Sequence, residues 1–347
     1  MTKIDIISGF LGAGKTTLIN RLIHEAYSGE KIVLIENEFG EIGIDGGFLK
    51  DAGIEISEMN SGCICCSLVG DFSEALKKVV DEYAPDRILI EPSGVGKLSD
   101  VTKAVLAAEL EGAEINSAVA VVDVNKCKMY MKNFGEFFGD QISNAGCVLF
   151  SHTDKTTDTK LAEALSLVRD KNPDAVIITT PADKLSVDSL VSALEQKSTL
   201  KAHIDALIEK DACPVCGHHH HDHDEECECH DNHHHHHDHD EECECHDNHH
   251  HHHHHADDIF TSWGRETIKK YSKDDIKNIL LAFDDSEKYG MVLRAKGMVE
   301  CPCGKWIYFD YVPGEADIRE GSPEPIGKIC VIGSKINEDA ISELFGI

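Results

Sequence analysis

The stretch GFLGAGKT, from Gly9 to Thr16, has residue types and a spacing that suit phosphate binding. It matches G-x-x-x-x-G-K-[ST] and lies directly after an apolar run and before a helical one, which is the context that this motif requires. Glycines there let backbone N–H groups converge on phosphates, Lys15 adds positive charge, and the Thr16 hydroxyl reaches Mg²⁺. The predicted nucleotide contacts in this loop are Gly9, Gly12, Ala13, Gly14, Lys15, Thr16 and Thr17.

Two later strand ends add carboxylates. The run RILIEPSG places Glu91 at the carboxyl edge of a predicted sheet, where it can act on Mg²⁺ through water or orient an attacking water. Gly94 leaves room for backbone motion near a terminal phosphate. The run CVLFSHTD places Asp154 after another strand, where a carboxylate can accept two hydrogen bonds from guanine. Lys15, Thr16 and Glu91 are the candidate catalytic residues.

Most of the 14 cysteines fall in tight clusters. In SGCICCSL, three thiols within four residues can supply up to three soft metal ligands, although free cysteines also pack well as small apolar residues. The candidate ligand clusters are Cys63, Cys65 and Cys66, Cys213 and Cys216, Cys227 and Cys229, and Cys243 and Cys245. A further pair, Cys301 and Cys303, either shares a site with Cys213 and Cys216 or forms a local turn.

A sixteen-residue unit is written twice between residues 221 and 255. Of the 23 histidines, 20 lie from 218 to 255, interleaved with carboxylates and with two Cys-Glu-Cys triplets. Imidazole and thiolate suit Zn²⁺, Ni²⁺, Co²⁺ or Cu, so we expect many overlapping weak sites, with His230 and His246 beside the triplets among the ligands. A solvated polar linker is the alternative. Because the segment has almost nothing apolar to bury, we expect disorder without metal.

The charge of the chain restricts its partners. A formal net charge of −30 over 347 residues argues against nucleic acid and against an anionic membrane surface. The sequence contains no long apolar run of the kind that spans a membrane, and its first residues lack the pattern of a secretory signal, so we expect a cytoplasmic protein. A homo-oligomer is compatible with the sequence.

The hydrophobic pattern predicts an α/β fold. From residue 3 to about 200, short apolar runs alternate with helical stretches, which is typical of a mostly parallel sheet with helices on both faces. Composition changes sharply near residues 210 and 256. After 256 we expect a small α+β domain with strands over 257–266, 291–300, 306–312 and 327–333 and a last helix over 338–345. The predicted domains are therefore 1–210, a metal-binding linker at 211–256, and 257–347.

Four motifs in this order, GFLGAGKTT, ENEFGEIGID, NSGCICCSL and EPSG, resemble those of the CobW-type P-loop GTPases, and the resemblance covers nearly the whole chain. It implies a P-loop NTPase domain with a CobW-like C-terminal domain, and GTP hydrolysis coupled to metal delivery, so the expected partner is a metal-receiving client protein. It also implies an internal metal site at Cys63, Cys65 and Cys66. By the same resemblance ENEFGEIGID is a first switch, which makes Glu36 and Glu41 candidates for metal or Mg²⁺ contacts, although they also suit simple loop caps.

The sequence departs from this family where guanine is read. The family usually has Asn-Lys-x-Asp, whereas this chain has Ser151, His152, Thr153 and Asp154. Asp154 keeps the carboxylate, and His152 must replace a lysine whose stem covers the base plane. An imidazole can stack there, so GTP stays favoured, with weaker affinity or relaxed specificity as a consequence.

Together these patterns predict a GTP-binding and GTP-hydrolysing metallochaperone with Mg²⁺ as cofactor. Its cargo is expected to be zinc, or cobalt in second place because the family includes cobalamin-related members. One alternative is a histidine-rich metal store in which nucleotide is not coupled to transfer. Another is a P-loop ATPase or kinase that acts on a small molecule.

Overall fold

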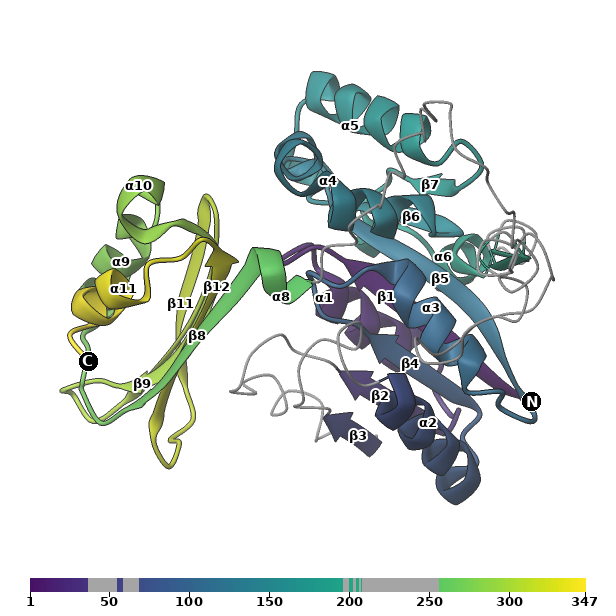
Figure 1. Ribbon diagram of the computed structural model, residues 1–347, viewed down its shortest axis with the longest axis horizontal. Helices are drawn as coiled ribbons and strands as arrows, with labels where there is room; N and C mark the ends of the chain where they lie inside the picture. The colour runs from purple at the N-terminus through teal and green to yellow at the C-terminus, as the bar shows by residue number, and fades with distance from the viewer. Residues whose placement is uncertain (37–54, 59–68, 196–199, 202–203, 206, 208–255) are drawn as a thin grey trace, which may run out of the picture.

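The computed structural model of the protein describes residues 1–36, 55–58, 69–195, 200–201, 204–205, 207 and 256–347. These residues form two sheets that lie side by side, each with its own helices (Figure 1). The first sheet belongs to the N-terminal part of the chain and the second to the residues after 256.

The first sheet has seven strands in the order β3-β2-β4-β1-β5-β6-β7, and every neighbouring pair is parallel. The strands are β1 (Thr2–Gly9), β2 (Ile32–Glu36), β3 (Glu55–Glu58), β4 (Arg87–Glu91), β5 (Ala113–Asp123), β6 (Cys147–Ser151) and β7 (Val176–Ile178). The carboxyl ends of β1 and β4 lie next to each other, which is where an α/β sheet binds its ligands.

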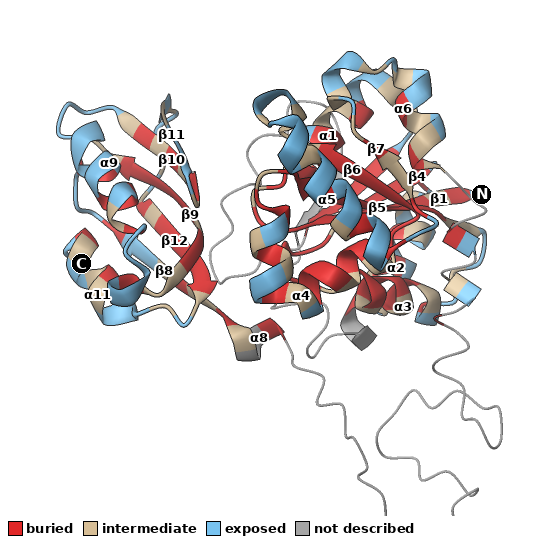
Figure 2. Cartoon of the chain, turned by 90° about the horizontal axis from the view of Figure 1, so that it is seen from above, coloured by how far each residue is buried: buried red, intermediate tan, exposed pale blue. Residues whose placement is uncertain are grey.

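Helices cover both faces of this sheet because its central strands are apolar on both sides. In β4, Ile88 and Ile90 pack into one core cluster, whereas Leu89 between them packs into the other. The first face carries α2 (Val69–Tyr83), α3 (Leu98–Ala107), α4 (Cys127–Ser143) and α5 (Asp158–Lys171). The second carries α1 (Lys15–Arg21), its π-helical continuation η1 (Leu22–Ala26) and α6 (Val187–Leu194). Buried residues accordingly line the strands and the inward sides of these helices (Figure 2).

The second sheet is antiparallel, in the order β11-β10-β9-β12-β8. Its strands are β8 (Phe260–Thr267), β9 (Met291–Glu300), β10 (Trp306–Val312), β11 (Glu315–Gly321) and β12 (Gly327–Ser334). One face of this sheet packs against α9 (Lys273–Ala282) and α11 (Glu338–Phe345), and the short α10 (Ser286–Tyr289) precedes β9. The core of this layer includes Trp263, Phe283 and Phe345.

The two layers share an apolar contact at the phosphate-binding loop. Phe10, inside that loop, is fully buried with Tyr130, Phe134 and Phe138 of α4. Phe260, the first residue of β8, completes the cluster at 6.1 Å between its ring centre and that of Phe10. A loop built to bind a ligand is therefore packed directly against the C-terminal sheet.

Most predicted elements are confirmed, including the helix over 338–345 and the mostly parallel sheet. The strand predicted over 257–266 begins only at Phe260, because a short helix, α8 (Ala256–Ile259), precedes it. Ala256 and Ile259 both pack against the first core cluster, and a helical turn places residues three apart on one face. The predicted boundaries at 210 and 256 stay predictions, since 208–255 lies outside the described residues. Within the described part of the chain, no helix is long and apolar enough to cross a membrane.

Candidate nucleotide site

The phosphate-binding loop owes its shape to glycines with backbone angles that other residues avoid. Gly9, Gly12 and Gly14 have φ values of 151°, 72° and 97°. A Cβ on Gly9 would overlap with the carbonyl oxygen of Val121 on the neighbouring strand. The Ala13 N–H donates to the Phe10 carbonyl at 3.1 Å, which closes the turn before α1 begins at Lys15. The sequence therefore folds this stretch into a compact loop of backbone N–H groups.

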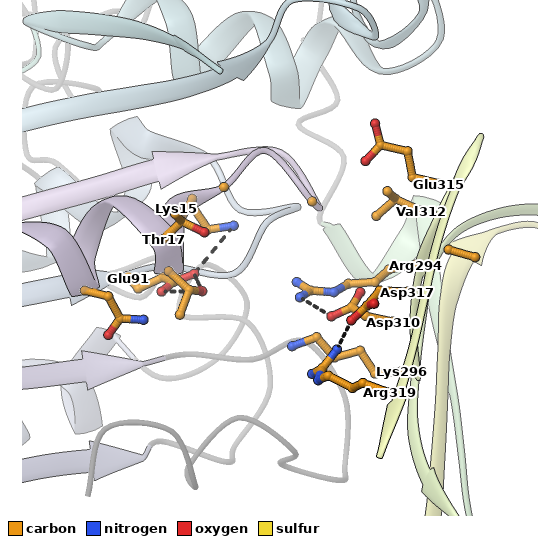
Figure 3. Close-up of a pocket in the computed structure, with 15 residues that line it drawn as sticks. Lys15, Thr17, Glu91, Arg294, Lys296, Asp310, Val312, Glu315, Asp317 and Arg319 are labelled. Atoms are coloured by element: carbon orange, nitrogen blue, oxygen red, sulfur yellow. Dashed lines mark hydrogen bonds and ion pairs between the residues drawn. The ribbon is translucent and has the colours of Figure 1, made fainter. Parts of the chain in front are cut away.

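Lys15, Thr16 and Glu91 come together below this loop. The Thr16 hydroxyl is 3.2 Å from both carboxylate oxygens of Glu91, and the Lys15 ammonium is 3.8 Å from one of them. The Lys15 side chain is 5% exposed and that of Glu91 is 13% exposed. Figure 3 shows the interaction between Lys15 and Glu91 as a dashed line. A hydroxyl beside a carboxylate is a pair of hard oxygen donors, so these residues fit Mg²⁺.

Glu36 lies beside this group. It ends β2, is 7% exposed, and is the register partner of Glu91 on β4. The segment that follows Glu36 in the sequence therefore starts next to the predicted nucleotide site. Glu41, on that segment, lies outside the described residues.

The loop after β4 is fixed against the phosphate-binding loop. A Cβ on Gly94 would lie 2.7 Å from a side-chain carbon of Leu11, so the close approach requires glycine. The buried side-chain amide of Gln141 donates to the carbonyls of Gly94 at 3.3 Å and Gly96 at 2.7 Å. Sequence reasoning did not single out Gln141, because a glutamine within a helix carries no motif.

The residues expected to read the base follow β6. His152 has φ 57° and precedes the 3₁₀ turn η4 (Thr153–Lys155), and its carbonyl accepts a hydrogen bond from Asn125 at 3.5 Å. Asp154 is exposed. Among the described residues, the buried hydroxyls of Ser151, Thr153 and Thr156 have no hydrogen-bond partner. Ser151 lies beside the phosphate-binding loop, since a Cβ on Gly14 would be 3.9 Å from the Cβ of Ser151.

A second charged pair, Asp123 and Lys126, lies at the carboxyl end of β5 and was not predicted from the sequence. Asp123 is 2% exposed, lies in register with Ser151, and its carboxylate is 3.4 Å from the Lys126 ammonium. The Asn125 N–H donates to the other carboxylate oxygen at 2.9 Å. The run VVDVNK carried a usable signal, because it is the end of a strand followed by polar residues. This strand lies next to β1, which leads into the phosphate-binding loop.

The C-terminal sheet closes the other side of the site. A cavity of about 460 Å³ is lined by the phosphate-binding loop and by side chains of β9, β10 and β11 (Figure 3). We call this second wall the charged sheet face; it consists of Arg294, Lys296, Asp310, Val312, Glu315, Asp317 and Arg319. Sequence reasoning missed it, although charged residues at alternate positions of VLRAKG and of EADIRE predict a shared face.

Cys301 and Cys303 form a hairpin turn between β9 and β10. The Cys301 N–H donates to the Lys305 carbonyl at 2.7 Å, and Gly304 has φ 79°. The hydrogen bond between the two thiols raises the pKa of Cys301 and lowers the pKa of Cys303. Whether this pair shares a metal with Cys213 and Cys216 stays open, because those two residues lie outside the described part.

Most predicted metal ligands lie on residues that the structure does not describe. They are Glu41, Cys63, Cys65, Cys66, Cys213, Cys216, Cys227, Cys229, His230, Cys243, Cys245 and His246. Among the residues that it does describe, no group of three or more His, Cys, Asp or Glu is arranged to hold a metal ion.

Several known proteins are similar to this chain in sequence. A zinc chaperone YeiR from Escherichia coli is 34% identical over 158 residues, which cover 45% of this chain and 48% of the relative. A zinc chaperone CobW from a Sinorhizobium species is 33% identical over 195 residues, covering 48% and 54%. The chain thus spans about half the length of the curated relatives that it matches. The solved structure of the Zn(II)-bound YjiA GTPase from E. coli aligns over 99% of this chain and 98% of that one, with 18% identity and a TM-score of 0.41.

The match to a family model covers the residues that build the site. Residues 3–179 match the model described as CobW/HypB/UreG, nucleotide-binding domain. This range includes the glycine loop, Glu91 and the strand end that carries Asp154. The phosphate-binding geometry and this match, over half of the chain, agree: the protein belongs to the CobW/HypB/UreG family.

Proposed function

We propose that the protein is a GTP-hydrolysing zinc chaperone, with zinc as the cargo that it passes to a client protein. The observation that carries the proposal is the convergence of Lys15, Thr16 and Glu91 under the glycine loop, since this arrangement suits a nucleoside triphosphate and Mg²⁺. Membership of the family and relatives named zinc chaperones support it.

In this proposal each residue of the site has a defined task. The loop N–H groups and Lys15 bind the phosphates, and Thr16 with Glu91 holds Mg²⁺, which neutralises phosphate charge. Glu91 also orients the attacking water. Asp154 accepts hydrogen bonds from guanine while His152 stacks on the base, and Thr17 and Gly94 border the phosphates.

The metal tasks fall on the thiols and histidines named from the sequence. Cys63, Cys65 and Cys66 bind one zinc ion tightly, and the repeated strip at 218–255 collects zinc loosely. The segment that carries Glu41 and these thiols follows Glu36, which ends its strand beside Glu91. Nucleotide bound beside Glu91 is therefore close in space to Glu36, the residue after which the metal segment begins in the sequence, which gives a route for coupling.

The finer assignments are part of the proposal. Cobalt is the second candidate cargo, in a cobalamin-related pathway. The client is a protein, and neither nucleic acid nor a membrane is a partner. A cytoplasmic location and a homo-oligomeric state are expectations from the sequence.

One observation favours the metal-store alternative, namely the 20 histidines of the strip, which exceed what a single delivery site needs. A store and a chaperone differ in one measurable way: the zinc affinity of a store does not change with the nucleotide that is bound.

Release of phosphate from GTP and from ATP by the zinc-free, full-length protein in the presence of Mg²⁺ tests the nucleotide half of the proposal. We expect turnover with GTP, little with ATP, and a loss of at least about tenfold in Lys15→Ala, because removing one charged hydrogen bond in a site costs about 1.5–3 kcal/mol. The matched control is Lys128→Ala, an exposed lysine of α4. Equal turnover of ATP would instead favour the small-molecule ATPase or kinase.

A further inference from the structure

The charged sheet face places three cations opposite the phosphate-binding loop. Arg294 and Lys296 come from alternate positions of β9, and Arg319 comes from β11. All three line the same cavity as Gly12, Lys15 and Glu91. In Figure 3 the side chains of Arg294 and Lys296 extend from the sheet toward Lys15 and Glu91.

These cations are mostly buried at the wall of the cavity. Lys296 is 7% exposed and the Arg294 side chain is 19% exposed, so both have lost most of their hydration. Ala295, between them in sequence, packs into the core on the opposite face, which fixes both cations toward the cavity. A cation that has lost most of its water attracts a bound anion more strongly than an exposed cation does, because less solvent screens the interaction.

Carboxylates on the same face orient the cations. Asp310, opposite Lys296 in the strand register, accepts a hydrogen bond from Arg294 at 3.5 Å. Asp317 accepts one from Arg319. A guanidinium carries five N–H donors, so an ion pair with one carboxylate is compatible with a phosphate contact. Glu315 lies beyond Val312, away from the cations (Figure 3).

The loop and the sheet touch, so the cations are held at a fixed place. Gly12 has φ 72°, and a Cβ there would overlap with the Val312 side chain. Phe10 packs with Phe260 on the same side of the loop. Side chains on regular strands in contact with the loop are preorganised for a ligand bound there.

We propose that Lys296 and Arg294 bind the terminal phosphate of a nucleoside triphosphate held by the phosphate-binding loop. The C-terminal sheet thereby distinguishes a triphosphate from a diphosphate, because loss of the terminal phosphate removes the anion that these cations contact. This inference rests on the proposed function, since it takes a guanine nucleotide as the ligand.

The test is the affinity of the full-length protein for GDP and for a non-hydrolysable GTP analogue, measured by displacement of a fluorescent guanine nucleotide. The variants are Lys296→Met, which keeps the side-chain length without charge, and Arg294→Gln. The matched control is Lys273→Gln, which removes an exposed cation of the same sheet layer. We expect each site variant to lower the affinity for the GTP analogue by about 10- to 100-fold, as for the loss of a charge-assisted hydrogen bond. The affinity for GDP should change less than about twofold.

The outcomes separate this inference from the proposed function. If the wild-type protein binds neither guanine nucleotide, the proposed function is wrong and the inference falls with it. If the wild type binds both, and the two site variants leave the ratio of the affinities unchanged, the inference is overturned while the proposed function stands. GDP affinity reports whether each variant is folded. If Lys296→Met loses GDP binding, the ratio of analogue affinity to GDP affinity in Arg294→Gln decides whether the inference holds.

Discussion

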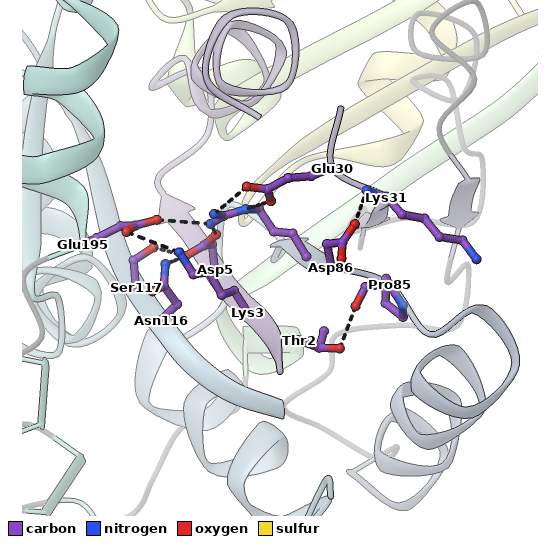
Figure 4. Close-up of polar contacts among 11 residues, drawn as sticks. Thr2, Lys3, Asp5, Glu30, Lys31, Pro85, Asp86, Asn116, Ser117 and Glu195 are labelled. Atoms are coloured by element: carbon purple, nitrogen blue, oxygen red, sulfur yellow. Dashed lines mark hydrogen bonds and ion pairs between the residues drawn. The ribbon is translucent and has the colours of Figure 1, made fainter. Parts of the chain in front are cut away.

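Arg87 lies at the centre of a buried ion cluster at the edge of the sheet away from the nucleotide site. Its side chain is 2% exposed and forms an ion pair with Asp5, which is equally buried. The guanidinium also contacts Glu30 at 2.7 Å and Glu195 at 3.3 Å, and lies 3.6 Å above the ring centre of Tyr27. Figure 4 shows Asp5, Glu30 and Glu195 converging on this point.

Replacing Arg87 with Met keeps most of the side-chain volume and removes the charge. The carboxylate of Asp5 then stays buried without a cation, which typically costs about 3–5 kcal/mol. Asn116 and Ser117 still donate hydrogen bonds to Asp5 at 2.8 and 2.7 Å, so we expect the lower end of this range. The predicted loss in the free energy of unfolding is therefore about 3 kcal/mol.

Urea unfolding at pH 7, followed by circular dichroism, measures this loss. Adding Asp5→Asn to Arg87→Met should restore at least about 1 kcal/mol, because the amide does not require a compensating charge. Lys128→Met serves as the control, since it removes an exposed ion pair worth less than about 1 kcal/mol. A loss for Arg87→Met no larger than that of the control, or no recovery in the double variant, would refute the reasoning.

Three further predictions concern the site and two buried thiols. Glu91→Gln should slow GTP hydrolysis by at least about tenfold, because an amide holds Mg²⁺ and orients the attacking water less well than a carboxylate does; unchanged turnover in a phosphate-release assay would contradict this. Gly12→Ala should weaken nucleotide binding and lower the midpoint of thermal unfolding, because a Cβ overlaps Val312; partial recovery with Val312→Ala is expected, and its absence would place the defect elsewhere. Burial raises the pKa of Cys127 and of Cys147 to about 12, whereas a thiol in the unfolded chain titrates near 9. The stability that the protonated thiols contribute is thus complete below pH 9 and is lost as the pH rises toward 12. The difference in the free energy of unfolding between wild type and Cys147→Ala should therefore shrink by about 1.4 kcal/mol between pH 8 and pH 10. A constant difference in urea unfolding would contradict this.

Local signals predicted the glycine loop and the strand end that lies beside it. Gly14 and Lys15 lie at the junction of a strand and a helix, and the backbone freedom of glycine decides the loop shape before any tertiary contact forms. Glu91 was predicted beside this loop because parallel strands end at one edge of the sheet. The short-range distances between Thr16 and Glu91 follow from the same rule.

The wall supplied by the C-terminal sheet could not be derived in this way. Arg294 and Lys296 lie almost 300 residues from Gly12, and their approach depends on how two separately folded layers pack. The strand β11 was also missed, because its alternating charges look like a surface turn when its partner strand is unknown. Most metal ligands were proposed from residue type, close spacing and the family resemblance, and Cys65 and His230 lie outside the described residues.

Zinc affinity in different nucleotide states tests the central claim most directly. The measurement is a competitive Zn²⁺ titration against a chromophoric chelator, with Co²⁺ in parallel, without nucleotide, with GDP, and with a non-hydrolysable GTP analogue. Full-length protein and a variant lacking residues 213–255 are compared. We predict that the shortened protein keeps one tight zinc site whose affinity differs about 5- to 150-fold between GDP and the analogue, and loses it in Cys65→Ser with Cys66→Ser. If every tight site disappears with residues 213–255, and the nucleotide changes no affinity, the protein is a zinc store and the chaperone account is wrong.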